Sequence, residues 1–301
     1  MDHLIDLSAT PGIRLWAEDQ GAADAPPLLL IMGAQASGLG WPDELVSLLA
    51  TRHRVIRYDH RDTGRSTWAY DDHPYPLTAL ADDALAVLDA LGVTRAHVVG
   101  MSLGGMLTQL LMADHPDRLL SATLLGTGAL SDTPYRHPDG TRTPPEDFPG
   151  VDPRIMELWS QPWTDQGREA ELDRRVAHWR LLSGGQLPFD ADYFRALERK
   201  VIDHTGHHRP GDAHGRADQS GMLRTEQLAR NTVPTLVISA LAEPVYPLPH
   251  AHHLAQVIHG AHLVEIPGMG HALPPEIHKP LAAAILDHTT GPSPVRPHQP
   301  S

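Results

Sequence analysis

The sequence contains no cysteine among its 301 residues. Disulfides, thiolate metal sites and cysteine nucleophiles are therefore excluded. Long apolar runs are missing as well, because no stretch approaches the roughly 18 residues that a membrane-spanning helix needs. The opening letters, MDHLID, have neither the basic region nor the apolar core of a signal peptide. We expect a cytoplasmic protein that does not bind a membrane.

Excess positive charge is a third absence. Lys and Arg number 24 against 37 Asp and Glu, which gives a formal net charge of −13 with histidine counted as neutral. Nucleic-acid-binding surfaces depend on basic patches, and no basic cluster stands out along this chain. The composition argues against nucleic acid as a partner and leaves the oligomeric state open.

Histidine, in contrast, is abundant, with 21 copies in the chain. None of these histidines has the His-Glu-x-x-His spacing of a zinc helix, and the missing cysteines exclude a Cys/His ligand set. We interpret them as surface or pocket residues and predict neither a metal nor another cofactor. They make pH-dependent behaviour between about pH 5 and 8 an expectation.

Short apolar runs bounded by turn residues alternate with helical patterns along much of the chain. Strands are predicted at 28–32, 54–58, 96–99, 119–125, 234–239 and 261–266, and helices at 41–51 and 77–91. Strands that alternate with helices pair in parallel through right-handed crossovers. The pattern therefore predicts an α/β fold, with a mostly parallel sheet flanked by helices on both faces.

The alternation stops near residue 127 and resumes near residue 234. The intervening pattern indicates a loop, three helices without strands and a polar stretch, at 129–150, 153–159, 166–182, 190–202 and 205–220. We predict an α/β core formed by residues 1–130 and 231–290, a helical cap at 131–230 and a disordered tail at 291–301.

Three of the six tryptophans, Trp159, Trp163 and Trp179, lie in the predicted cap. Ligand pockets are mainly apolar and aromatic, so we expect these side chains to line a substrate pocket beneath a lid. The alternative is that the inserted segment only stabilises the fold and does not bind the substrate.

The most informative motif is GMSLG at 100–104, which lies between a predicted strand and a helical pattern. In this context Gly-x-Ser-x-Gly predicts a nucleophile elbow, a sharp turn that pushes the Ser102 hydroxyl clear of the backbone. The turn leaves no room for a side chain at the positions of Gly100 and Gly104, and glycine has none. The alternative interpretation is a glycine-rich turn with an incidental serine.

A serine nucleophile needs a base, and the base needs an acid that orients it. His271 follows the last predicted strand in a glycine-rich loop, and it comes last in the expected chain order of serine, acid and histidine. Glu243 is the nearest carboxylate after the preceding strand and is the predicted acid. Asp132 is the reserve candidate, and a solvated loop glutamate is the alternative interpretation of Glu243.

An oxyanion hole needs two backbone donors. The Leu103 N–H at the start of the elbow helix is one candidate, and the Ala34 N–H in the loop MGAQ at 32–35 is the other. Residues 59–66, DHRDTGRS, contain no phosphate-binding spacing. We interpret the Asp and Arg of this segment as bonded to one another.

These motifs together resemble the α/β-hydrolase superfamily of serine esterases over residues 10 to 288. Within it, the segments GWPDE at 40–44, RYDHRDTGRS at 57–66 and EIPGMGHALP at 265–274 resemble the aclacinomycin-type anthracycline methylesterases. The resemblance implies Ser102 as the nucleophile, His271 as the base, and the Ala34 and Leu103 amides as oxyanion donors. It also implies a methyl ester on an aromatic polyketide as substrate, in antibiotic biosynthesis.

The chain departs from this family at three places. The family acid is an aspartate where this chain has Glu243, the family's oxyanion loop has a second glycine and an asparagine, and residues 206–221 are unlike the family. We predict a serine carboxylic ester hydrolase that acts through an acyl-enzyme on a bulky small-molecule ester. The alternatives are another chemistry on the same fold (a decarboxylase, lyase or cyclase) and a non-catalytic ligand-binding homologue.

Overall fold

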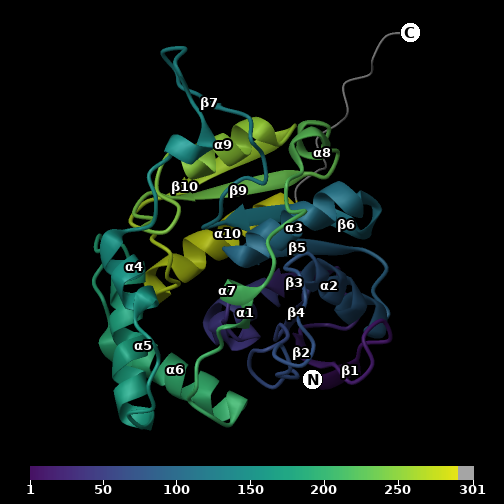
Figure 1. The fold of residues 1–301 in the computed structure, drawn as a ribbon. Helices are drawn as coiled ribbons and strands as arrows, with labels where there is room; N and C mark the ends of the chain where they lie inside the picture. Colours follow the sequence, from purple (N-terminus) through teal and green to yellow (C-terminus); the bar gives the residue numbers. More distant parts are fainter. Residues whose placement is uncertain (291–301) are drawn as a thin grey trace.

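The computed structural model describes residues 1–290, so the predicted tail at 291–301 lies outside the described residues. An eight-stranded sheet forms the centre, in the order β1-β2-β4-β3-β5-β6-β9-β10 (Figure 1). Its strands are β1 (Asp2–Asp6), β2 (Arg14–Gln20), β3 (Pro27–Ile31), β4 (Arg54–Tyr58), β5 (Ala96–Met101), β6 (Leu119–Leu125), β9 (Thr235–Ala240) and β10 (Ala261–Ile266). The strands from β4 to β10 in this order run parallel, whereas β2 is antiparallel to both β1 and β4.

The central strands are buried on both faces, which explains their continuous apolar sequences. In β3, Leu28 and Leu30 belong to the same hydrophobic cluster as residues of α1 (Asp43–Leu49) and α10 (Pro275–Thr290). Leu29 belongs to the opposite cluster, with residues of α2 (Ala79–Ala90), α3 (Leu103–Asp114) and α9 (His250–Val257). Successive side chains of a strand point to opposite faces, so one apolar run fills both layers. The predicted α/β fold is confirmed.

The sequence pattern did not predict β1 and β2. Neither strand has a continuous apolar run, because β1 is an edge strand with one buried side chain and the end of β2 is polar. The short hairpin of β7 (Tyr135–Arg136) and β8 (Arg142–Thr143) was also missed, and it lies in the segment expected to be a loop. It projects from the top of the molecule in Figure 1.

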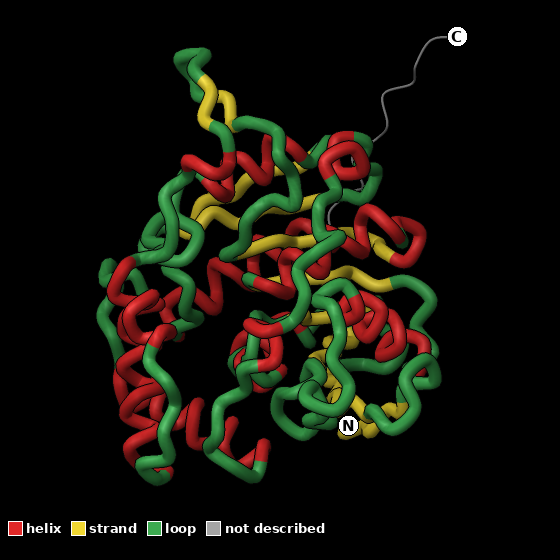
Figure 2. Tube along the Cα trace, viewed as in Figure 1, coloured by secondary structure: helices red, strands yellow, loops and turns green. Residues whose placement is uncertain are grey.

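Three helices of the segment 131–230 form a layer beside the sheet: α4 (Pro153–Ser160), α5 (Arg168–Leu182) and α6 (Ala191–Thr205) (Figure 2). They correspond to the three helices predicted there. The short helices α7 (Ala213–Arg216) and α8 (Thr225–Ala229) follow. Ile155, Leu182 and Phe194 of the layer share a hydrophobic cluster with Val245 and Ala272, which follow β9 and β10. The inserted helices therefore pack directly on the loops beyond the carboxyl ends of two central strands.

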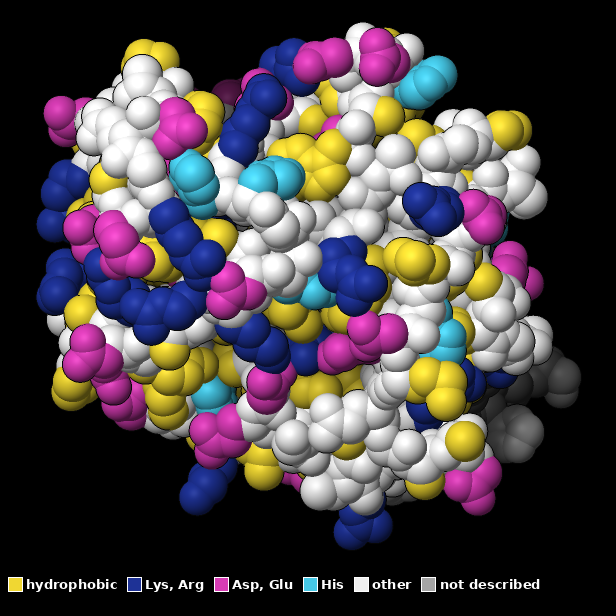
Figure 3. Space-filling view, turned by 90° about the horizontal axis from the view of Figure 1, so that it is seen from below, with side chains coloured by type: hydrophobic (Ala, Val, Ile, Leu, Met, Phe, Trp, Pro, Cys, Tyr) yellow, Lys and Arg dark blue, Asp and Glu magenta, His cyan; other side chains and the backbone are white. Residues whose placement is uncertain are grey.

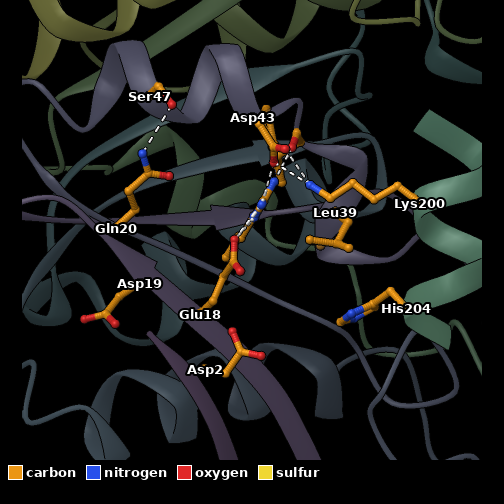
Figure 4. A network of polar contacts seen from close by, with 12 residues as sticks. Asp2, Glu18, Asp19, Gln20, Leu39, Asp43, Ser47, Lys200 and His204 are labelled. Carbon is orange, nitrogen blue, oxygen red and sulfur yellow. Dashed lines mark hydrogen bonds and ion pairs between the residues drawn. The ribbon is translucent and has the colours of Figure 1, made fainter. Parts of the chain in front are cut away.

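Polar contacts join α6 to the rest of the fold (Figure 4). The Lys200 ammonium lies 2.6 Å from Asp43 at the start of α1, and His204 Nε2 lies 2.7 Å from Asp59 Oδ2. Both partners of the Lys200 pair are solvent-exposed, so that pair adds little stability. Asp59 is buried and His204 is partly buried, and their contact ties the helix to the loop after β4.

Within residues 1–290, the helices are too short or too polar to traverse a lipid bilayer. On the face seen in Figure 3, Lys and Arg side chains lie among Asp and Glu side chains instead of forming a separate basic patch. Hydrophobic and histidine side chains show between these charges.

Candidate active site

Ser102 lies at the junction of β5 and α3, with φ 55° and ψ −120°. Positive φ is strained for a residue with a side chain, and such strain is typical of a nucleophile elbow. The Ser102 N–H donates to Leu125 O at 3.0 Å, which ties the turn to the end of β6. Two neighbours need to be glycine: a Cβ on Gly100 would collide with Gly104 O and Thr108, and a Cβ on Gly104 would collide with Ile31 O.

His271 and Glu243 come together at the carboxyl ends of β10 and β9. The His271 Nδ1 atom lies 2.9 Å from both carboxylate oxygens of Glu243. A carboxylate accepts, so Nδ1 carries the proton and Nε2 is left as the proton acceptor. This is the arrangement that a general base requires.

The Glu243 carboxylate is held as an anion. It also accepts hydrogen bonds from the amides of Val245 at 2.8 Å and Tyr246 at 3.3 Å. Burial alone would raise the pKa of Glu243, but the neighbouring His271 and the two amides outweigh it and lower the pKa below its usual value. The reserve candidate, Asp132, is exposed and accepts from the Thr225 hydroxyl at 2.7 Å.

The end of β6 contacts both the serine turn and the pair formed by His271 and Glu243. Gly126, which follows β6, lies against His271 and Glu243, so a Cβ there would be 3.0 Å from His271 Nδ1. The residue before it, Leu125, binds the Ser102 amide. Within residues 1–290 no hydrogen bond joins Ser102 Oγ to His271. Catalytic hydrogen bonds often tighten only in the substrate complex.

Of the two predicted oxyanion donors, Leu103 directly follows the serine in sequence and Ala34 follows Gly33. Gly33 packs against Ser102, where an added Cβ would lie 3.1 Å from the serine Cβ. The amides of Ala34 and Leu103 donate to no other group in the described part of the chain. Leu103 is the first residue of α3, where unpaired amides and the helix dipole favour negative charge. Both amides are thus available to an oxyanion.

The carboxyl end of α5 supports the loops that carry the acid and the base. The His271 amide donates to Leu182 O at 2.7 Å. Gly270 packs so closely on Leu182 and Ser183 that a Cβ would collide with their carbonyl oxygens. Gly184, with φ 70°, approaches Ala242 O in the same way. The sequence had no signal for these contacts, because they join residues about 60 to 90 positions apart.

The three predicted pocket tryptophans contact different partners. Trp179 donates to Glu198 and stacks on Phe194, and Trp163 donates to Glu171. Trp159 is half-exposed and donates to His178 Nε2 at 2.9 Å.

His178 itself was not predicted from the sequence. Burial lowers its pKa to about 4, and the positive charge of Arg174 lowers it further.

We interpreted the Asp and Arg residues of 59–66 as bonded to one another, and this is wrong for their side-chain ion pairs. Arg61 forms a two-pronged ion pair with Asp83 of α2. Asp59 accepts from Ser37, Gly38 and the Arg65 amide as well as from His204. Apart from the Arg65 amide, these partners come from other elements, so the segment links α2, the loop after β3 and α6. Among residues 1–290, no cluster of three His, Asp or Glu side chains has the arrangement of a metal site.

The fold and this site define a serine hydrolase of the α/β type. The family model described as the alpha/beta hydrolase fold matches residues 26–276. The chain belongs to the α/β-hydrolase family, and it is an enzyme.

Two curated relatives are similar over nearly the whole chain. Rhodomycin D methylesterase DauP of Streptomyces sp. (strain C5) is 46% identical over 283 residues, which cover 92% of this chain and 95% of that protein. Rhodomycin D methylesterase DnrP of Streptomyces peucetius is 44% identical over the same shares. Among solved structures, a hydrolase from Pseudomonas aeruginosa PA01 is similar with a TM-score of 0.69 and 28% identity, over 97% of this chain and 98% of that one.

Proposed function

We propose that this enzyme hydrolyses the methyl ester of an anthracycline-type aromatic polyketide, with Ser102, His271 and Glu243 as its catalytic triad. The observation that carries the proposal is the 46% identity, over 92% of the chain, to a rhodomycin D methylesterase. The hydrogen bonds between His271 and Glu243 and the strained turn at Ser102 support the same chemistry. The expected product is the free carboxylic acid together with methanol.

The first half of the reaction forms an acyl-enzyme. Ser102 Oγ attacks the ester carbonyl carbon while His271 Nε2 takes its proton. The Ala34 and Leu103 amides donate to the oxyanion of the tetrahedral intermediate. The intermediate then collapses, the bond from the carbonyl carbon to the methoxy oxygen breaks, and His271 returns the proton to release methanol.

The second half uses water in place of the serine. His271 Nε2 removes a proton from the water, which attacks the acyl carbonyl at the same oxyanion hole. Collapse of the second intermediate returns the proton to Ser102 and releases the carboxylic acid. Throughout, the ionised Glu243 fixes the histidine tautomer and stabilises the imidazolium.

The proposal gives residues 131–230 the role of a substrate-binding cap, with residues 1–130 and 231–290 as the catalytic core. The packing of Ile155, Leu182 and Phe194 on Val245 and Ala272 supports this division, because it seats the inserted helices on the acid and base loops. We assign the contact with a planar substrate to Trp159, because it is the most exposed of the three tryptophans. Trp163 and Trp179 would shape the wall behind it.

The test is direct incubation of the purified enzyme with rhodomycin D, followed by mass spectrometry of the product and assay of methanol. We expect the mass loss of one methylene unit, equal amounts of acid and methanol, and no product with Ser102→Ala. A substrate that loses carbon dioxide, or that is converted equally by Ser102→Ala, would overturn the proposed chemistry. Turnover of p-nitrophenyl acetate by the wild type alone would retain the esterase and reject the anthracycline.

A further inference from the structure

A buried histidine of the inserted segment contacts the proposed oxyanion loop. His214 lies in the short helix α7 and is 3% exposed. Its Nδ1 accepts from the Gln35 amide at 2.9 Å, and its Nε2 lies 3.0 Å from Arg61 O. A carbonyl can only accept, so Nε2 carries the proton and Nδ1 presents a lone pair to Gln35. In Figure 1, α7 is drawn near the middle of the molecule.

Gln35 needs such a partner because its backbone is strained. It is one of three non-glycine residues with positive φ in the described chain, at 61°, and the others are Asp62 and Ser102. A left-handed conformation is unfavourable for a residue with a side chain, so it persists where surrounding contacts enforce it. The hydrogen bond to His214 is the contact that the Gln35 amide makes.

A second imidazole holds the other end of the same loop. His60 Nε2 donates to Met32 O at 3.0 Å, and the rings of His60 and His214 meet edge to face with centroids 5.5 Å apart. The Met32 carbonyl belongs to the peptide plane before Gly33, and the Gln35 amide belongs to the plane after Ala34. Each plane is rigid. The plane between them carries the Ala34 N–H, so anchors on both sides set its direction.

We propose that His214 is a positioning residue of this esterase, which fixes Gln35 and thereby aims the Ala34 amide at the ester oxyanion. The inference rests on the proposed function, which makes Ala34 an oxyanion donor. His214 lies in residues 206–221 of the insertion, so the insertion would support the oxyanion loop of the core. His214 acts through the backbone and does not touch the reacting atoms.

Two substitutions separate the two hydrogen bonds of His214. Asn places its Oδ1 at the position of Nδ1, so His214→Asn keeps the acceptor for Gln35 and loses the donor to Arg61. Gln places its Nε2 at the position of the ring Nε2, so His214→Gln keeps the donor and loses the acceptor. The two variants differ in the one contact that the proposal requires.

The experiment measures kcat and KM for p-nitrophenyl acetate with both variants at one temperature, well below their unfolding midpoints. We expect His214→Gln to lower kcat about 10- to 100-fold with KM changed less than about twofold, because a lost oxyanion donor costs about 10²–10³ in rate and a misdirected one costs less. His214→Asn should stay within about threefold of the wild type. Amide hydrogen exchange of a peptide covering residues 33–36 should accelerate in His214→Gln alone.

A matched control is His53→Gln. His53 is equally buried and also uses both ring nitrogens, toward Pro26 O and Thr289, but it precedes β4 at the end of the sheet opposite the site. This variant should lower the unfolding temperature and leave kcat unchanged.

Equal kcat values for the Asn and Gln variants, or a loss confined to KM, would overturn the role of His214. If the wild type loses no activity on Ser102→Ala, the proposed function fails instead. Full dependence on Ser102 combined with a wild-type kcat in His214→Gln rejects the positioning role alone.

Discussion

At the scale of single residues, the proposed acid Glu243 has the greatest chemical consequence. Its longer side chain brings both oxygens to 2.9 Å from His271 Nδ1, while the Val245 and Tyr246 amides hold the carboxylate from its other side. The extra methylene, compared with the aspartate of the resembled family, is accommodated by this backbone cradle. The glutamate can therefore orient the imidazole as an aspartate would.

Replacing the Glu243 carboxylate with an amide should disable the base. We expect Glu243→Gln to lower kcat for p-nitrophenyl acetate by about 10²–10⁴, because an amide can stabilise the wrong histidine tautomer and carries no charge to stabilise the imidazolium. Asp132→Asn is the control and should retain full activity, since Asp132 binds Thr225 at the surface. Steady-state kinetics of both variants at pH 7.5 or so check this, and a loss confined to Asp132→Asn would move the acid there.

Single residues were also what the sequence predicted best. The spacing of Gly100, Ser102 and Gly104 was sufficient for the elbow, because each residue answers a local steric demand of one turn. The sequence placed Glu243 in the loop after a predicted strand but could not decide between Glu243 and Asp132 as the acid. The choice depends on which carboxylate reaches His271, and that distance is set by packing between β9 and β10.

At the scale of elements, the carboxyl end of α5 braces the acid and base loops. Leu182 O accepts from the His271 amide, and Gly184 packs against Ala242, next to Glu243. The short helix α7 of the insertion supplies His214 to the oxyanion loop. The inserted segment therefore contacts the backbone of the base loop, the acid loop and the oxyanion loop.

The pair Gly184 and Gly185 tests this brace. Both have positive φ, but a Cβ on Gly184 would collide with Ala242 O whereas a Cβ on Gly185 meets nothing within 4 Å. Alanine at either position should cost about 1 kcal/mol in backbone strain. We expect Gly184→Ala to cost more and also to lower kcat about tenfold or more, because it displaces the loop of Glu243.

The measurement combines urea unfolding with steady-state kinetics of the two alanine variants. Gly185→Ala serves as the control for strain alone and should keep the wild-type kcat. A brace at this point is rejected if the two variants share the same kcat.

At the scale of the whole molecule, the buried histidines link folding to pH. His60, His97 and His214 have their pKa values lowered, to about 3, 4 and 4, in each case by burial first. In the unfolded chain a histidine takes up its proton near pH 6.5. Between that pH and the folded values, the unfolded state binds more protons than the folded state, so stability falls as the pH falls.

We therefore expect the free energy of unfolding to be highest above about pH 7 and to decline from about pH 6.5 toward pH 4. Each buried histidine contributes up to about 1.4 kcal/mol per pH unit in this window. Urea unfolding at pH 7.5, 5.5 and 4.5 or so measures the slope, and His97→Gln should make it shallower. A stability that is flat or rises over this range would contradict the assignment.

The sequence by itself determined the α/β class, the elbow and the three helices of the insertion. All of these depend on local patterns: apolar runs that fill both faces of a parallel sheet, helical periodicity, and glycines at a tight turn. The family followed from the same motifs. The pattern did not predict β1 and β2, because the edge strand β1 buries one side chain and the end of β2 is polar.

Only the tertiary structure decided which groups meet. The partner of His271, the true partners of Asp59 and Arg61, and the hold of His214 on Gln35 all join residues far apart in the chain. Their hydrogen bonds depend on distances between loops at the carboxyl edge of the sheet, and no spacing in the sequence encodes such a distance. The turn at Ser102 could be predicted because it is local, whereas the groups around it required the fold.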